Sequence, residues 1–220
     1  MFRGIPIRGV IHTTSTGRQQ GKLSFKQLNR KKGEHLTVHD DWERVHSQRG
    51  WGKWPRDTLN YFLTAYRQSI TGNPKDVKLL DVGCGNGNSM WLALAVGLDA
   101  YGVDISESAV KRTKEFLKNV GHPEAKVQVS DMAKLPYEDN FFNVVIDICS
   151  LQHNPAEARQ EIVKEINRVL VQDGHYFLVY RSRESYLEPE PFPMYPLDKK
   201  ELSELLSPYF NIQAMEREAR

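Results

Sequence analysis

Three glycines at alternate positions, Gly83, Gly85 and Gly87, separate a short apolar run from a stretch rich in leucine and alanine. Glycine lets a backbone come close to a ligand, and the free N–H groups that begin a helix attract a carboxylate. An acid, Asp104, ends the next apolar run, 17 residues after Gly87. An acid at such a strand end can accept hydrogen bonds from both ribose hydroxyls of an adenosine. The spacing therefore predicts a site for an adenosine-containing cofactor between a strand and a helix.

Two classes of cofactor compete for this glycine pattern. A dinucleotide site uses G-x-G-x-x-G, in which the third glycine allows the helix to approach a pyrophosphate. Here the third glycine comes one residue earlier, and Asp81 stands on the strand before the loop. Three further stretches follow in order: "SDMAKLPYEDNFFNVVI" (130–146), "SLQHNP" (150–155) and "INRVLVQDGHYFLV" (166–179). Together with the loop they resemble the class I (Rossmann-like) S-adenosylmethionine-dependent methyltransferases, of the methyltransferase type 11 kind, over roughly residues 77–215.

The resemblance implies which residues hold the two parts of S-adenosylmethionine. Those expected around its methionine part are Asp81, Gly83, Cys84, Gly85, Asn86, Gly87, Ile148 and Cys149. Those expected around its adenosine are Asp104 on the ribose, Ile105 and Met132 on the adenine ring, and Asp131 on the exocyclic amine. Taken singly, Asp131 also suits a turn and Met132 a hydrophobic core. Cys84 has no basic neighbour in the sequence that would make it a nucleophile.

Methyl transfer needs a base only where the acceptor, a hydroxyl or an ammonium, must lose a proton. His153 in "SLQHNP" is the candidate, because the resemblance places it just after the fourth strand, over the cofactor. The alternative is a histidine that caps the helix beginning at Pro155 or packs against it. Gln152, Asn154 and Tyr186 are weaker candidates of the same kind. The remaining histidines lack the spacing of metal ligands, so no metal is expected.

Two tryptophans, Trp51 and Trp54, stand in "RGWGKWP" ahead of the first predicted strand. The resemblance implies an N-terminal segment that folds across the mouth of the cofactor site. An aromatic face beside a sulfonium is favoured by cation–π attraction, so either ring is a candidate lid over the methionine part, with Lys53 or Arg56 near its carboxylate. The alternative is a hydrophobic staple that packs the start of the following helix onto the body.

Strands and helices alternate from residue 77 onward, which predicts an α/β, doubly wound, mostly parallel sheet with an N-terminal helical or lid extension. The predicted strands are 77–83, 99–104, 125–131, 141–149, 175–180 and 209–215, with a turn at 172–174. The predicted helices are 54–74, 89–97, 106–120, 155–170 and 197–206, with Pro55 as the first helical residue of the first of them. The expected organisation is an arm (1–36), a lid segment with its helix (37–74) and a methyltransferase domain (75–220).

Two features depart from the family pattern. Its seventh strand, antiparallel and hairpinned to the sixth, has no counterpart, so a covering segment or a homodimer is expected at the sixth strand. The arm holds eight lysines and arginines against Glu34 alone, although the whole chain has a net charge of only +2. The arm is interpreted as a docking element for an anionic surface, as a lid, or as residues translated upstream of a start at Leu36.

The expected function is transfer of a methyl group to an O or N of a small-molecule or glycan-type acceptor. Residues 180–196, Pro-rich and aromatic, are the expected acceptor wall. The alternatives are a methyltransferase that acts on RNA, DNA or protein through the basic arm, and a non-catalytic S-adenosylmethionine-binding protein. With two cysteines and no apolar run long enough for a signal peptide or a membrane span, a cytoplasmic protein is expected.

Overall fold

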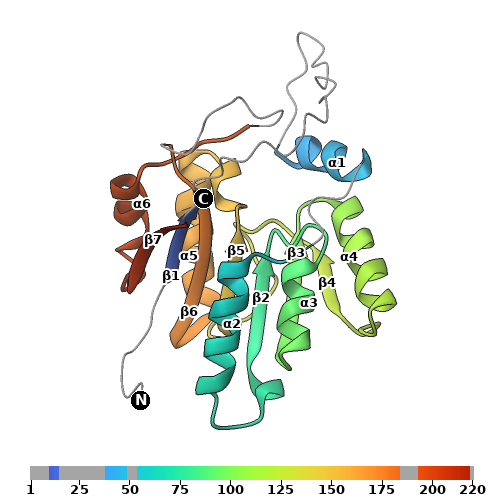
Figure 1. Ribbon diagram of the computed structural model, residues 1–220. Coiled ribbons are helices and arrows are strands. Elements are labelled where there is room, and N and C mark those ends of the chain that lie inside the picture. Colours follow the sequence, from blue (N-terminus) through green and yellow to red (C-terminus); the bar gives the residue numbers. More distant parts are fainter. Residues whose placement is uncertain (1–9, 15–37, 49–53, 184–192, 219–220) are drawn as a thin grey trace.

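The computed structural model describes residues 10–14, 38–48, 54–183 and 193–218 (Figure 1). Seven strands form one sheet in the order β4-β3-β2-β5-β6-β1-β7, and all its neighbouring pairs are parallel. The strands are β1 Val10–Thr14, β2 Lys78–Val82, β3 Asp99–Asp104, β4 Lys126–Val129, β5 Phe142–Ile148, β6 Leu170–Arg181 and β7 Ala214–Glu218. The α-helices are α1 Val38–Gln48, α2 Asp57–Ser69, α3 Asn88–Ala95, α4 Glu107–Asn119, α5 Ala156–Val169 and α6 Lys199–Leu206. None of the helices within these ranges is long and apolar enough to cross a membrane.

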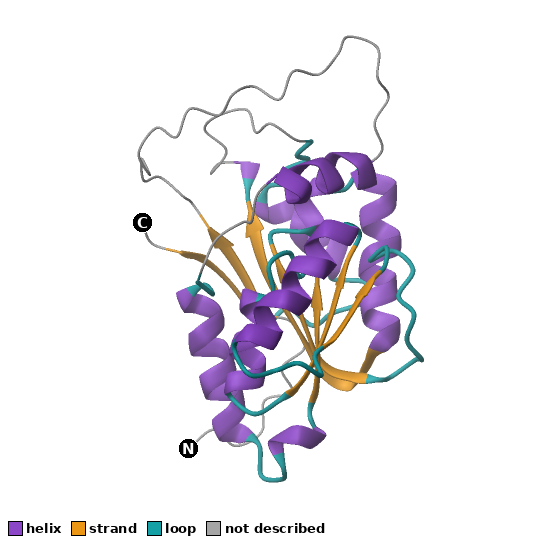
Figure 2. Ribbon diagram, turned by 90° about the vertical axis from the view of Figure 1, so that its right-hand side faces the viewer, coloured by secondary structure: helices purple, strands orange, loops and turns teal. Residues whose placement is uncertain are grey.

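Helices cover both faces of the sheet, as Figure 2 shows. One core lies under α5 and α6 and includes Val145 and Ile166, while the other lies under α2, α3 and α4 and includes Leu63 and Val144. Val144 and Val145 are consecutive residues of β5 that point into opposite cores, which is why this central strand is apolar throughout. The predicted doubly wound, mostly parallel fold is confirmed.

Several predicted boundaries differ from the structure, and the predicted helix 54–74 ends already at Ser69. Helix α2 begins at Asp57, because Arg56 is extended (φ −71°, ψ 143°), so Pro55 precedes the helix by two residues. Strand β6 runs through residues 172–174, which were expected as a turn; the positive φ of Asp173 (59°) and the register shift opposite it mark a bulge instead. The final strand begins at Ala214, because Phe210 is buried in the core and its N–H, at 2.9 Å from the carbonyl oxygen of Leu206, completes α6.

The N-terminal strand β1 enters the sheet between β6 and β7. Its residues pair in register with Phe177–Arg181 on one side and with Ala214–Glu218 on the other, parallel to both. The place at which the family pattern predicts an antiparallel seventh strand is therefore taken by a segment of the basic arm. Part of the arm belongs to the sheet, and β7 forms the edge of the described strands.

Helix α1 was not expected from the sequence. Its residues 38–48 are mostly polar or charged, and only Asp41, Val45 and His46 are fully buried among its described side chains. Helix α1 lies above the carboxyl ends of the strands, close to the start of α4 (Figure 1). In a parallel sheet this edge is where ligands bind.

Candidate active site

The glycine loop, residues 83–87, joins β2 to α3 with three left-handed glycines. Gly83, Gly85 and Gly87 have φ of 69°, 53° and 80°, values that side chains with a Cβ rarely adopt. The N–H groups of Gly83 and Cys84 donate to the carbonyl oxygen of Val103 at 2.8 and 2.9 Å, which fixes the loop against the end of β3. The three glycines of the sequence pattern therefore allow the backbone conformation that forms this loop.

The three glycines differ in what surrounds them. A Cβ on Gly83 would lie 2.1 Å from Oγ of Ser150, and a Cβ on Gly87 would lie 2.7 Å from Cγ2 of Thr113. These two positions therefore require glycine for packing within the protein as well. Among the described residues, a Cβ on Gly85 would meet only Cε1 of His46, at 3.8 Å, and a backbone oxygen at 4.0 Å. Gly85 is thus the glycine with room beside it, and the nearest side chain comes from α1.

Asp81 and Asp104, the two acids expected to bind the cofactor, are both buried at the carboxyl ends of their strands. Burial, followed by the negative charges of Asp147 and Asp104, raises the pKa of Asp81 well above its ordinary value. Within the described residues its Oδ2 has no hydrogen-bond partner. A buried carboxylate oxygen in this position fits a ligand cation such as an ammonium group.

Asp104 is engaged by the backbone on both sides. Its Oδ2 accepts from the N–H of Gly85 and its Oδ1 from the N–H of Ser106, each at 2.9 Å. Burial raises the pKa of Asp104, although His46 and these N–H groups act in the opposite direction. Because each oxygen has a second lone pair, Asp104 is oriented by the loop and keeps acceptor capacity for a ligand hydroxyl.

Asp147, an acid that the sequence reading missed, shapes the turn after β5. Its Oδ1 accepts from the N–H of Ser150 at 2.7 Å and its Oδ2 from the N–H of Leu151 at 3.1 Å. The side chain is fully buried, and burial raises its pKa to about 7. These bonds start the short 3₁₀ helix η2 (Leu151–His153), which carries the histidine predicted as a base. An acid inside an otherwise apolar strand is the signal that could have identified it.

His153 is buried, and its tautomer follows from its partner. Nδ1 lies 2.9 Å from the carbonyl oxygen of Pro193, which can only accept, so Nδ1 carries the hydrogen of the neutral ring. Burial lowers the pKa of His153 to about 4, so the ring is neutral at pH 7 and Nε2 carries a lone pair. The expected helix cap is not its role, because its ring nitrogen contacts residue 193 and α5 has no side-chain cap.

The segment that follows residue 192 is anchored beside His153. The N–H of Tyr195 donates to the carbonyl oxygen of Gln152, and the hydroxyl of Tyr180 and the guanidinium of Arg159 both donate to the carbonyl oxygen of Tyr195. The predicted acceptor wall is described only at its two ends, and residues 184–192, including Tyr186, lie outside the described residues.

Helix α1 places an aromatic ring over this site. The Trp42 ring lies edge-on to His153 with centroids 4.8 Å apart, and its centroid is 5.6 Å from that of His46. Glu43 holds the helix down: its carboxylate accepts from Oγ of Ser106 at 2.7 Å and from the N–H of Ser108 at 3.1 Å, at the start of α4. Hydrogen bonds from Ser108 and Ser106 lower the pKa of Glu43 to about 2. The Arg112 guanidinium also donates to the carbonyl oxygen of His46.

Of the two tryptophans expected as a lid, Trp54 alone belongs to the described residues. Trp51 lies outside the described residues, and Trp54 is 79% exposed just before α2, so its ring is not a staple against the body. Arg56, expected near the carboxylate of the cofactor, has Nη2 at 3.8 Å from Sγ of Cys149 at the end of β5. Cys149 has a positive φ of 66° and is half-buried. Trp42, six residues beyond the basic arm, is the described tryptophan that lies over the site.

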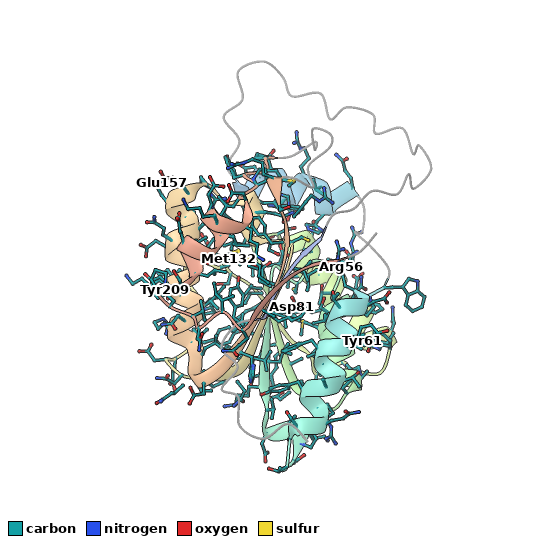
Figure 3. All side chains as sticks on the ribbon, turned by 60° about the vertical axis from the view of Figure 1, so that its left-hand side comes forward. Arg56, Tyr61, Asp81, Met132, Glu157 and Tyr209 are labelled. Carbon is teal, nitrogen blue, oxygen red and sulfur yellow. The ribbon has the colours of Figure 1, made fainter. Side chains whose placement is uncertain are left out.

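The remaining predicted residues lie around the same edge of the sheet. Figure 3 shows Asp81 in the interior, with Arg56 toward α2 and Met132 toward the opposite side of the sheet. Asp131 is exposed and its Oδ1 accepts from the N–H of Ala133 at 2.8 Å, as a turn residue does. Met132 is half-buried beneath Asn154 and packs on the core under α5. Ile105 and Ile148 are half-buried, while Cys84 is buried with its pKa raised well above the ordinary value by burial.

The site combines a glycine loop between a strand and a helix, an acid at the end of the next strand and a buried acid ahead of the loop, which is the arrangement expected for an adenosine-containing cofactor. Comparison with known proteins agrees. Residues 80–178 match the family described as "Methyltransferase domain". Over these residues the chain is thus similar to a methyltransferase domain, and solved structures such as a protein of Pyrococcus horikoshii share its fold.

Individual relatives match over part of their length. The chain is 34% identical over 105 residues to tocopherol O-methyltransferase of Arabidopsis thaliana, a match that spans 46% of this chain and 29% of the relative. It is 35% identical over 107 residues to a sterol 4-C-methyltransferase of Caenorhabditis elegans, spanning 48% of this chain and 31% of the relative. A crystal structure of a Pyrococcus horikoshii protein has the same fold, with a TM-score of 0.59, 24% identity and coverage of 72% and 83% of the two chains. The chain thus spans less than half of these two curated relatives.

Proposed function

We propose that the protein transfers a methyl group from S-adenosylmethionine to an oxygen or nitrogen of a small-molecule acceptor. The observation that carries this proposal is His153, a buried neutral histidine whose Nδ1 is held by the Pro193 carbonyl oxygen. Its Nε2 carries a lone pair on the same sheet edge as the glycine loop. An acceptor hydroxyl or ammonium needs such a group to take its proton, whereas a thiolate or an unprotonated amine does not.

Residues of four strand ends divide the work of binding. Asp81 would hold the ammonium of the methionine part, since its buried Oδ2 has no partner within the described residues. Asp104 would accept from the ribose, and Ile105, Asp131 and Met132 would surround the adenine. Cys84, Asn86, Ile148 and Cys149, with the Gly83–Gly87 backbone, would surround the methionine part. When bound, S-adenosylmethionine supplies an activated methyl group, so the protein mainly contributes alignment and exclusion of water.

Trp42 would cover the reacting centre from α1. Its ring lies edge-on to His153, and an aromatic face near a sulfonium is favourable. In this proposal Trp42 takes the lid role that the sequence suggested for Trp51 or Trp54. Trp54, exposed as it is, would reach the cofactor only if the segment before α2 changed its position.

The test measures transfer of a labelled methyl group to separate pools of phenols and alcohols, amines, sugar nucleotides and RNA. Labelled product in a small-molecule pool supports the proposal. Transfer to RNA alone would contradict it and favour the basic arm as a docking element. Binding of S-adenosylmethionine without transfer to any pool would favour a non-catalytic binding protein. Once an acceptor is known, His153→Gln should lower kcat about 100-fold or more with little change in cofactor affinity.

We also propose that the protein acts in the cytoplasm, since its two cysteines are too few for a disulfide framework. The outer side of β7, which has no further neighbour among the described strands, is the surface through which a homodimer would form. Sedimentation of the purified protein at several concentrations tests this second point.

A further inference from the structure

His46, in the last turn of α1, is a buried histidine with an unused polar atom. The residue is only 4% exposed, and its Nδ1 has no hydrogen-bond partner within the described part of the chain. A buried ring nitrogen without a partner costs free energy, so such a group is either strained by the fold or awaits a ligand. No motif of the sequence pointed to it.

The ring of His46 lies at the open side of the glycine loop. Its Cε1 is the side-chain atom nearest to the position of a Cβ on Gly85, at 3.8 Å. The carboxylate of Asp104 is close enough to act on it electrostatically, and so are Arg112 of α4 and Glu43 of α1. The Trp42 ring lies beside it, with a centroid distance of 5.6 Å. His46 therefore faces the point where the loop and the end of β3 meet.

The groups at the junction of the glycine loop and the end of β3 favour a ligand that bears a hydroxyl group. Asp104 is acceptor-only when ionised, and both of its oxygens already hold a backbone N–H. A ribose hydroxyl that donates its hydrogen to Asp104 keeps lone pairs that need a donor. An imidazole N–H beside the same carboxylate supplies that donor, and the ribose in turn satisfies the buried nitrogen.

We propose that His46 is a cofactor-binding residue. Its Nδ1 donates a hydrogen bond to the same ribose hydroxyl that itself donates to the Asp104 carboxylate. This rests on the proposed function, in which Asp104 binds the ribose. The α1 helix then closes on the cofactor as well as on α4. Trp42 is on the same helix as His46, and its ring lies next to the rings of both His46 and His153. Ribose binding by His46 therefore also positions the Trp42 ring, which covers the reacting centre.

Calorimetric titration with S-adenosylhomocysteine tests the assignment in the full chain. His46→Leu replaces the imidazole by an apolar side chain and so removes the donor. The Kd for S-adenosylhomocysteine should therefore rise about tenfold. His46→Asn places its carboxamide N–H near the position of Nδ1 and should restore affinity to within about threefold of wild type. His39→Leu, on the exposed side of the same helix, is the matched control and should bind as wild type does. Equal affinity of His46→Leu and wild type would overturn the proposal, and so would a failure of His46→Asn to recover affinity.

Analogues of the ligand give a second measurement on the unaltered protein. S-adenosylhomocysteine lacking the 2′- or the 3′-hydroxyl should bind wild type more weakly, and one of the two losses should shrink in His46→Leu. If neither hydroxyl matters to wild type, the proposal is wrong even where the variants misfold. The outcomes separate from those of the proposed function: wild type that binds no S-adenosylhomocysteine at millimolar concentration defeats both, whereas tight binding that ignores His46 defeats this inference alone.

Discussion

At the scale of single residues, the site is built from buried polar groups with incomplete satisfaction. Among the described residues, Oδ2 of Asp81 and Nδ1 of His46 have no hydrogen-bond partner, and both groups lie at the carboxyl edge of the sheet. A fold tolerates such groups at a cost in stability when ligand binding recovers the loss. This explains why an acid such as Asp81 precedes the glycine loop although its burial does not stabilise the unliganded protein.

Asp81→Asn should separate stability from binding. The variant removes a buried carboxyl group whose pKa is raised by folding. Such a group makes the folded protein less stable as the pH rises above the ordinary pKa of 3.8. The variant should therefore be more stable than wild type without ligand, and the gain should be larger at pH 8 than at pH 5. Its affinity for S-adenosylmethionine should fall about 10- to 100-fold, because a charged hydrogen bond is lost.

Thermal unfolding at the two pH values and calorimetry measure the two effects of Asp81→Asn. Asp76→Asn, at an exposed position in the connection before β2, serves as its control. Unchanged cofactor affinity in Asp81→Asn would remove Asp81 from the binding site.

His153 makes stability depend on pH with the opposite sign. Burial lowers its pKa from 6.5 to about 4, so the unfolded chain binds the proton more readily and stability falls as pH drops through this window. At pH 5 the loss should be about 2 kcal/mol relative to pH 7.5. Urea unfolding of wild type and His153→Gln at both pH values measures it, and the variant should lack this part of the loss. A parallel fall in the two proteins would mean that His153 binds its proton equally well in the folded and unfolded states.

At the scale of elements, α1 is held by charge rather than by an apolar stripe. The Glu43 carboxylate caps the start of α4 through Ser106 and Ser108, and the helix contributes few buried apolar side chains. An element attached in this way opens more readily than the strands beneath it, which suits a segment that must admit a ligand.

Glu43→Gln should loosen α1 without unfolding the sheet. Because the contact is half-exposed, the expected loss is about 1 kcal/mol, or roughly fivefold in the opening equilibrium. Hydrogen exchange of the α1 amides at pH 7.5 measures this opening. Exchange in β5 should stay as in wild type, and Glu115→Gln, on the exposed side of α4, should leave α1 unchanged.

The pH dependence of α1 docking is expected from an acid, Glu43, and a base, His46. The pKa of Glu43 is lowered to about 2, so its contribution is complete above pH 4.5 and constant through the neutral range. Burial lowers the pKa of His46, so docking of the neutral ring is complete above pH 6.5 and weakens as pH falls below that value. Cofactor affinity should therefore be lower at pH 5.5 than at pH 7.5, and His46→Asn should remove most of this difference.

At the scale of the whole molecule, β1 joins the two ends of the described chain in one sheet. It lies between β6 and β7, so it supplies both strands with a neighbour. Without it, β6 would present an unpaired edge and β7 would lose its only partner among the described strands. The basic arm therefore contributes to the sheet, whatever else its charges do.

Removal of residues 1–15 should destabilise the protein and promote aggregation. The loss should be at least about 2 kcal/mol, because two ladders of backbone hydrogen bonds are opened together. Removal of residues 1–8, which leaves β1 intact, is the matched control and should change stability little. Urea unfolding and light scattering measure the difference. Equal stability of the two shortened chains would show that the sheet does not need β1, as expected if translation started at Leu36.

The sequence by itself determined the elements whose cause is local. The glycine loop follows from three positions that need positive φ, and the order of the β2-to-β6 region follows from alternating apolar periods. Together with the later motifs they carry the resemblance from which the cofactor class is predicted. His153 remains a predicted base, chosen because the resemblance places it just after the fourth predicted strand. Each of these signals lies within one element or one turn, so no distant contact is needed to interpret it.

Only the tertiary structure decided which distant residues complete the site and the sheet. Glu43 contacts Ser106 across 63 positions, His46 reaches Gly85 from another helix, and β1 pairs with residues more than 160 positions away. No local period records such pairings: α1 is too polar to show an apolar stripe, and β1 is stabilised by backbone pairing with two strands that come last in the chain. Aromatic content favoured Trp51 and Trp54 for the lid, whereas the docking of α1 onto α4 brings Trp42 there. Contacts of this kind depend on the assembled sheet, because only the sheet brings its carboxyl edge and the N-terminal segments together.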